Sequence, residues 1–145
     1  MRSIRKTMTI EVICAAFILL FVYTAVGKMR DFEKFSIELS KSPILYSISS
    51  WLVLAIPSIE IALSIFLIIR PFRLVALYGS FSLMVMFSAY IIAILKFSSY
   101  IPCTCGGVLQ NMSWKEHLVF NLGFVVLGAI GVLIYPERVK ILSAQ

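Results

Sequence analysis

Charged and ionisable residues are scarce in this chain of 145 residues. Only 14% of the residues are charged and a single histidine is present, whereas 61% are hydrophobic and the mean hydropathy is +1.00. Such a composition excludes a soluble globular domain. The three cysteines lack the second ligand pair of a zinc site, and the chain has neither a haem-attachment motif nor a glycine-rich dinucleotide loop. We therefore expect a membrane protein without a metal site.

Basic residues outnumber acidic ones and give a net charge of +6. They flank apolar runs instead of clustering on a polar surface, so the charge indicates orientation in a membrane and not binding to nucleic acid. We therefore expect the chain to contact membrane lipid.

Four apolar runs have the length that crosses a bilayer. Only helices and closed barrels satisfy the backbone in lipid, and these runs are too continuous for barrel strands. The sequence therefore predicts an all-α membrane protein, a four-transmembrane-helix bundle in a single domain covering residues 1–145. The expected spans are Met8–Val26, Trp51–Ile69, Leu74–Leu95 and Leu118–Tyr135.

The connections between the runs differ in length. Residues 70–73 alone separate the second and third runs, so these two helices should be antiparallel neighbours. Gly27 is expected to end the first helix. Residues 28–50 mix charges with apolar residues at roughly helical spacing, which predicts an amphipathic helix on the membrane surface that ends near Ser42 and Pro43.

Orientation follows from the Lys and Arg residues. Four spans place the two termini and the 70–73 turn on one side, where seven basic residues lie close to the span ends, against six on the other side. Since basic residues in short segments favour the cytoplasm, we expect both termini to be cytoplasmic. Residues 96–117 then face the periplasm or exterior, where disulfides persist.

Two cysteines lie two positions apart in the stretch 101–107, between the third and fourth runs. A disulfide between Cys103 and Cys105 would close a very small, strained ring, which suits exchange better than structural cross-linking. Pro102 restricts the backbone before the pair, and Gly106 and Gly107 allow a partner to approach after it. Thiol–disulfide exchange is the first hypothesis, with idle thiols or half of a metal site as alternatives.

Glu60 is a carboxyl group near the middle of the second span, where a charged side chain is costly unless it is neutral or paired. Pro57, one turn earlier, favours a kink that would open a small pocket. Glu60 is thus either a functional group or a protonated carboxyl bonded to a hydroxyl group of the third span. The hydroxyl candidates are Tyr78, Ser82, Ser88 and Tyr90.

The fourth helix has a defined start, because Ser113 and Glu116 have the spacing of a capping box. His117 follows in the first turn, where it would exchange protons with a thiol or a quinone, or else be an interfacial polar residue beside Trp114. Phe81, Met84, Met86 and Phe87 are expected in core packing or lipid contact, with the wall of a quinone pocket as the alternative. Cys14 is expected to be a small buried hydrophobe.

Three segments carry a resemblance to a known group. They are Phe21–Lys28 at the end of the first span, Pro57–Glu60 in the second, and Pro102–Gly107 before the fourth. In these features the chain resembles the MauE branch of the DoxX-like membrane proteins, over nearly its whole length.

The resemblance implies a multi-pass protein of the bacterial inner membrane that acts in redox maturation with an extracytoplasmic thioredoxin-like partner. Its founding members are needed to assemble the disulfide-rich small subunit of methylamine dehydrogenase. We expect Cys103 and Cys105 to be the catalytic pair of a thiol–disulfide oxidoreductase, supported by Glu60, Lys28 and His117. A quinone is the candidate cofactor. The alternatives are a non-catalytic assembly subunit or a small proton-coupled transporter that uses Glu60.

Overall fold

Four long helices form the body of the molecule. The computed structural model describes residues 2–97 and 113–135, and the described residues contain helices and turns without strands. Each long helix is long and apolar enough to cross a membrane, which confirms the predicted all-α, four-helix membrane fold. Along the chain the elements are α1 (Arg2–Arg30), α2 (Phe32–Lys41), the 3₁₀ helix η1 (Tyr46–Ile48), α3 (Ser49–Ile68), the 3₁₀ helix η2 (Arg70–Phe72), α4 (Arg73–Phe97) and α5 (Trp114–Ile134).

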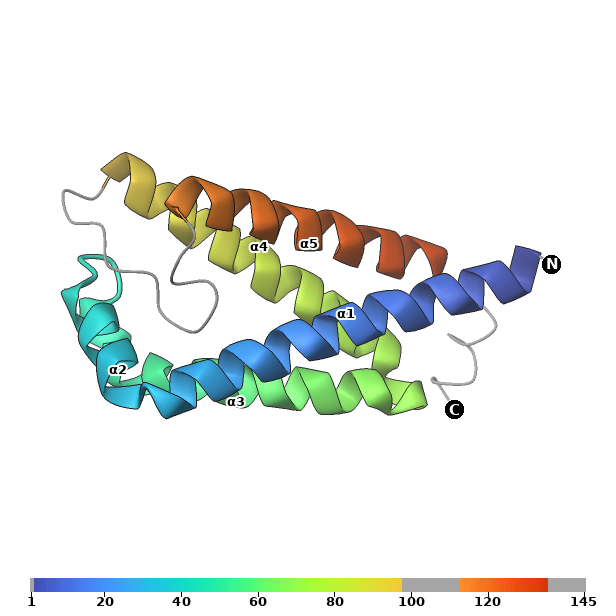
Figure 1. Ribbon diagram of the computed structural model, residues 1–145, viewed down its shortest axis with the longest axis horizontal. Coiled ribbons are helices and arrows are strands. Elements are labelled where there is room, and N and C mark those ends of the chain that lie inside the picture. The colour runs from blue at the N-terminus through green and yellow to red at the C-terminus, as the bar shows by residue number, and fades with distance from the viewer. Residues whose placement is uncertain (1, 98–112, 136–145) are drawn as a thin grey trace.

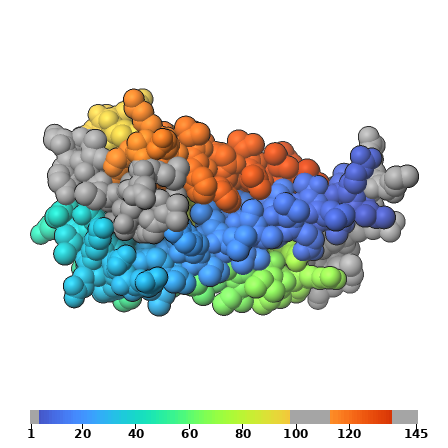
Figure 2. All heavy atoms as spheres, in the orientation of Figure 1, coloured from blue at the N-terminus to red at the C-terminus, as the bar shows by residue number. Residues whose placement is uncertain are grey.

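The helices associate as two pairs, α1 with α3 and α4 with α5. Figure 1 shows that the N-terminus of α1, the η2 turn and the end of α5 share one end of the bundle, while α2, the end of α4 and the start of α5 share the other. In the space-filling view, α1 and α5 form much of one face and α2 lies at one end (Figure 2). The short connection between α3 and α4 makes them antiparallel, as expected.

The prediction that Gly27 ends the first helix is wrong, because α1 continues to Arg30. The backbone N–H of Asp31 still donates to the Gly27 carbonyl at 3.2 Å, so the helical path is kept to the start of α2. Glycine lowers helix stability without stopping a helix. The extension places Lys28 one turn after Thr24, on the same helix face.

The amphipathic segment is present as α2, which packs on α3. Phe35 and Leu39 are buried against that helix. The helix ends at Lys41, before Ser42 and Pro43, as the sequence predicts.

The main hydrophobic core runs from Ile10 and Ile13, in the N-terminal half of α1, to the middle of the bundle. Its largest fully buried apolar side chains are Phe17, Phe21, Leu67, Leu77 and Met84. Near the end of α5, Gly131 allows close approach, since an added Cβ atom would lie 3.2 Å from Cγ2 of Ile13. The end of the bundle that contains the α1 N-terminus is therefore filled by side chains, and we call it the closed end. The α2 end contains a cavity, and we call it the hollow end.

Candidate functional site

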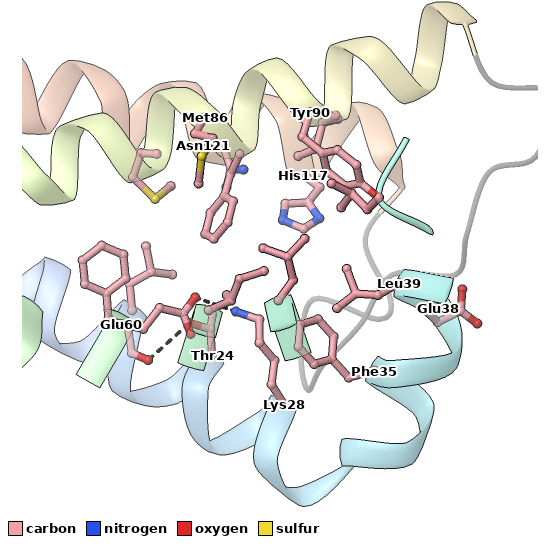
Figure 3. Close-up of a pocket in the computed structure, with 18 of the residues that line it drawn as sticks. Thr24, Lys28, Phe35, Glu38, Leu39, Glu60, Met86, Tyr90, His117 and Asn121 are labelled. Carbon is pink, nitrogen blue, oxygen red and sulfur yellow. Dashed lines mark hydrogen bonds and ion pairs between the residues drawn. The ribbon is translucent and has the colours of Figure 1, made fainter. Parts of the chain in front are cut away.

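A cavity of about 310 Å³ lies at the α2 end of the bundle, lined by residues of α1, α2, η1, α3, α4 and α5. Its walls are mostly apolar and aromatic, with a few polar side chains (Figure 3). A concave, largely apolar site with few polar groups is typical of small-molecule sites. The polar and amphipathic members are Thr24, Lys28, Glu38, Glu60, Tyr90, Trp114, His117 and Asn121.

An ion pair joins two of the residues predicted to support the site. Nζ of Lys28, on α1, lies 2.5 Å from Oε1 of Glu60, on α3, and the two side chains are only 12% and 1% exposed. The ammonium group also lies 5.9 Å from the ring centre of Phe35 and 5.7 Å from that of Phe87. Glu60 therefore pairs with the first span, and the alternative of a hydroxyl partner from the third span is wrong.

Two buried polar atoms of the cavity wall have no hydrogen-bond partner among the described residues. They are Oε2 of Glu60 and Nδ1 of His117. The Thr24 hydroxyl group lies beside the Glu60 carboxyl group. It donates its hydrogen bond to the Phe21 carbonyl oxygen at 3.3 Å, so Oε2 of Glu60 is left without a donor from Thr24. Buried polar atoms are usually paired, so these two atoms mark where a ligand can bind.

The start of α5 places His117 at the cavity. The backbone N–H of Ser113 donates to Oε2 of Glu116 at 2.8 Å, and the N–H of Glu116 donates to Oγ of Ser113 at 3.3 Å. This reciprocal pair confirms the predicted capping box. Trp114 stacks on His117 with ring centres 6.1 Å apart. The cap therefore sets the position from which both rings line the cavity.

Tyr90, on the same side of the cavity as His117, makes a hydrogen bond between elements. Its hydroxyl group donates to Oγ of Ser42 at 3.0 Å. This bond links α4 to the connection that follows α2. Figure 3 shows Lys28, Thr24 and Glu60 on one side of the cavity and His117 and Tyr90 on the other. Sequence reasoning assigned no site role to Thr24, and it offered Tyr90 only as a partner for Glu60.

The predicted catalytic pair, Cys103 and Cys105, lies outside the described residues. The described chain stops at Phe97 and resumes at Ser113, at the end of the bundle that contains the cavity (Figure 1). Cys14 is buried in the core as a free thiol and does not line the cavity. Met84, Met86 and Phe87 line it and Phe81 does not. The expected core packing is also present, because Met84 is buried in the core and Phe87 packs against it.

No group of three or more His, Cys, Asp or Glu residues is arranged to hold a metal ion in the part of the chain that is described. The cavity offers a different chemistry. It presents an ion pair, an imidazole and aromatic rings, which suit an organic ligand.

Residues 6–134 match the family model described as "Methylamine utilisation protein MauE". The chain belongs to the MauE family. A curated relative, the methylamine utilization protein MauE of Paracoccus denitrificans, is 31% identical over 100 residues, which cover 66% of this chain and 54% of the relative. The chain thus spans about half the length of that MauE relative. No solved structure matches.

Proposed function

We propose that this MauE-family protein is a membrane thiol–disulfide redox protein, in which Cys103 and Cys105 exchange electrons with an extracytoplasmic thioredoxin-fold partner. The observation that carries the proposal is the place of the Cys-x-Cys stretch in the chain. It connects α4 and α5 at the end of the bundle where Lys28, Glu60 and His117 line a cavity. We therefore assign thiol exchange to the end of the bundle that contains these three ionisable side chains.

The exchange proceeds through a mixed disulfide. A thiolate of the partner attacks the sulfur of Cys105 in the Cys103–Cys105 disulfide, and Cys103 leaves as a thiolate. The second thiolate of the partner then attacks the partner sulfur of the mixed bond and releases Cys105. The partner gains a disulfide, and two electrons and two protons pass to this protein.

Cys105 is assigned as the exchanging sulfur because Gly106 and Gly107 follow it. Flexible glycines can turn consecutive backbone N–H groups toward the sulfur and stabilise a thiolate. Cys103 follows Pro102, which has no N–H to offer.

The partner reaction belongs to methylamine utilisation in this proposal, since both the family description and the Paracoccus denitrificans relative carry that name. With the resemblance to the MauE branch, we propose a disulfide-rich subunit of a methylamine-oxidising enzyme as the substrate class. Loss of this protein should then leave that subunit with free thiols.

The orientation proposed is an inner-membrane protein with cytoplasmic termini. A membrane-impermeant maleimide should then label Cys103 or Cys105 in reduced intact cells. Cys14 is 2% exposed and should remain unlabelled. Labelling of the pair only after permeabilisation would contradict this orientation.

Replacement of both loop cysteines by serine tests the function in cells. The Cys103→Ser/Cys105→Ser variant should insert normally while the thiols of its partner accumulate in the reduced form, as measured by alkylation and gel shift. Cys14→Ser is the matched control and should leave the partner oxidised. Normal partner oxidation in the double variant would instead support the non-catalytic assembly subunit.

A proton-coupled transporter is the second candidate, favoured by the buried Glu60 that faces a cavity. It predicts that activity depends on Glu60 and not on the two cysteines. The same double cysteine variant separates the two functions.

A further inference from the structure

The charged side chains that line the cavity are each paired with an opposite charge, Lys28 with Glu60 and Glu38 with Lys41, which lies 4.0 Å from it. Lys28 and Glu60 neutralise each other across 2.5 Å, and an ammonium has three N–H donors, of which this pair uses one. A fatty acid or another anionic ligand would leave the Glu60 carboxylate opposed by a like charge. The cluster therefore suits a neutral ligand that accepts a hydrogen bond from Lys28 and can donate one to Oε2 of Glu60.

Polar atoms available to such a ligand lie on both sides of the cavity. Oε2 of Glu60, whose side chain is 1% exposed, and Nδ1 of His117 lack partners among the described residues. Figure 3 shows the two residues on opposite walls. A ligand with one polar group at each end of a flat ring would satisfy both walls at once.

The remaining walls match an aromatic ring with an apolar tail. Phe35, Phe87 and Trp114 line the cavity, and aromatic side chains pack against flat rings in offset or edge-to-face arrangements. Met86 and Ile48 also line it, yet they are 54% and 51% exposed. Both lie within membrane-spanning segments, so the cavity opens where a tail can pass into lipid.

We propose that this cavity binds the head group of an isoprenoid quinone, with one carbonyl oxygen accepting from Lys28 and the other from His117. Oε2 of Glu60 accepts from the hydroxyl group that forms when the quinone is reduced. The electron step rests on the proposed function. The Cys103–Cys105 dithiol becomes a disulfide, and its two electrons and two protons convert the quinone to a quinol.

Intrinsic fluorescence provides a binding test, because the chain has two tryptophans. Trp114 lines the cavity, and Trp51 is 82% exposed outside it. The full chain in nanodiscs, with Trp51→Phe, is titrated with decylubiquinone or a short-chain menaquinone. Quenching of Trp114 should saturate with added quinone. The control is the Trp114→Phe protein that keeps Trp51, and it should show only the linear quenching of a quinone dissolved in lipid.

Variants and competitors identify what the cavity recognises. His117→Phe keeps a ring beside Trp114 and removes the donor, so quinone binding should weaken about tenfold, as expected for one buried hydrogen bond. Lys115→Gln, an exposed neighbour in the same turn, is the matched control and should bind normally. Decanoate should not displace the quinone.

Three results would overturn the proposal. They are linear quenching of Trp114, equal affinity in His117→Phe and Lys115→Gln, and displacement by decanoate, which would assign the cavity to fatty acids. The Cys103→Ser/Cys105→Ser variant should bind quinone as tightly as the natural protein. A failure of thiol exchange would leave this binding unchanged, so the two proposals fail separately.

Discussion

Among the described residues, each end of the bundle carries one ion pair between long helices, and the surroundings of the two pairs are opposite. At the closed end, Nη1 of Arg73 lies 2.7 Å from Oε1 of Glu11, whose side chain is 50% exposed. At the hollow end, Lys28 meets a Glu60 side chain that is 1% exposed. The first pair keeps much of its hydration, whereas the second has lost nearly all of it.

This difference separates a peripheral contact from a candidate site. Burying two charges costs free energy that their attraction often fails to offset, and apolar replacements are frequently as stable. Stability alone therefore does not account for Lys28 and Glu60. Their position at the wall of a cavity, with Oε2 of Glu60 unpaired among the described residues, favours a functional role.

The largest effect should come from breaking the buried pair on one side. Lys28→Met leaves Glu60 as an unpaired buried acid, so the free energy of unfolding should fall by about 3–5 kcal/mol. Glu11→Gln breaks the exposed pair and should cost less than about 1 kcal/mol. Reversible unfolding in mixed micelles, followed by circular dichroism, measures both.

A double variant checks the cause of that loss. Lys28→Met/Glu60→Leu removes both charges and should recover most of the stability lost in Lys28→Met. If the single variant is no less stable than Glu11→Gln, the contrast between the two ends is wrong.

The next effect concerns the packing of the closed end. In Gly131→Val, the new Cβ atom would lie 3.2 Å from Cγ2 of Ile13 and 3.4 Å from Cδ2 of Leu77, so overpacking should cost about 1–3 kcal/mol. Gly123 is the matched control on the same helix, since an added Cβ atom there meets nothing within 4 Å. Equal losses of unfolding free energy in Gly131→Val and Gly123→Val would show that close approach is not what Gly131 provides.

At the hollow end, Glu60→Gln should reduce function more than stability. The amide keeps the shape of the side chain and a bond to Lys28 but does not take up a proton, so the rate of partner oxidation should fall roughly tenfold, which corresponds to about 1.4 kcal/mol. Protein abundance should be normal. Ser58→Ala changes an exposed residue of α3 whose hydroxyl group bonds to the Leu54 carbonyl, and it is the control. Full activity in Glu60→Gln would remove Glu60 from the mechanism.

The smallest effect should follow loss of the α5 cap. Ser113→Ala removes the side-chain acceptor of the Glu116 N–H and should lower the free energy of unfolding by about 1 kcal/mol. Ser82→Ala, at an exposed position of α4, should change it little. Equal stability of the two variants would mean that the cap does not stabilise α5.

The sequence predicted the features that depend on neighbouring residues. The four helices follow from the length of the apolar runs, and the start of α5 follows from Ser113 and Glu116. The end of α1 was wrong because helical hydrogen bonding continues past Gly27, where glycine only weakens a helix.

The candidate site was less accessible to sequence reasoning. Glu60 stood out because a carboxyl group is costly in a span, but its partner Lys28 lies 32 residues away on a helix that the prediction ended too early. The contributions of Thr24, Phe35 and Asn121 to the cavity depend on how the two helix pairs separate. That separation is a property of tertiary packing, which no local pattern in the chain reports.

Trapping the mixed disulfide tests the central claim most directly. In Cys103→Ala cells, Cys105 should form a higher-mass adduct with an extracytoplasmic thioredoxin-fold protein, visible on non-reducing gels and lost on reduction, while Cys105→Ala should trap little. Equal trapping by both variants would contradict the assignment of Cys105 as the exchanging sulfur. No adduct in either variant, together with normal partner oxidation in Cys103→Ser/Cys105→Ser, would contradict thiol–disulfide exchange itself.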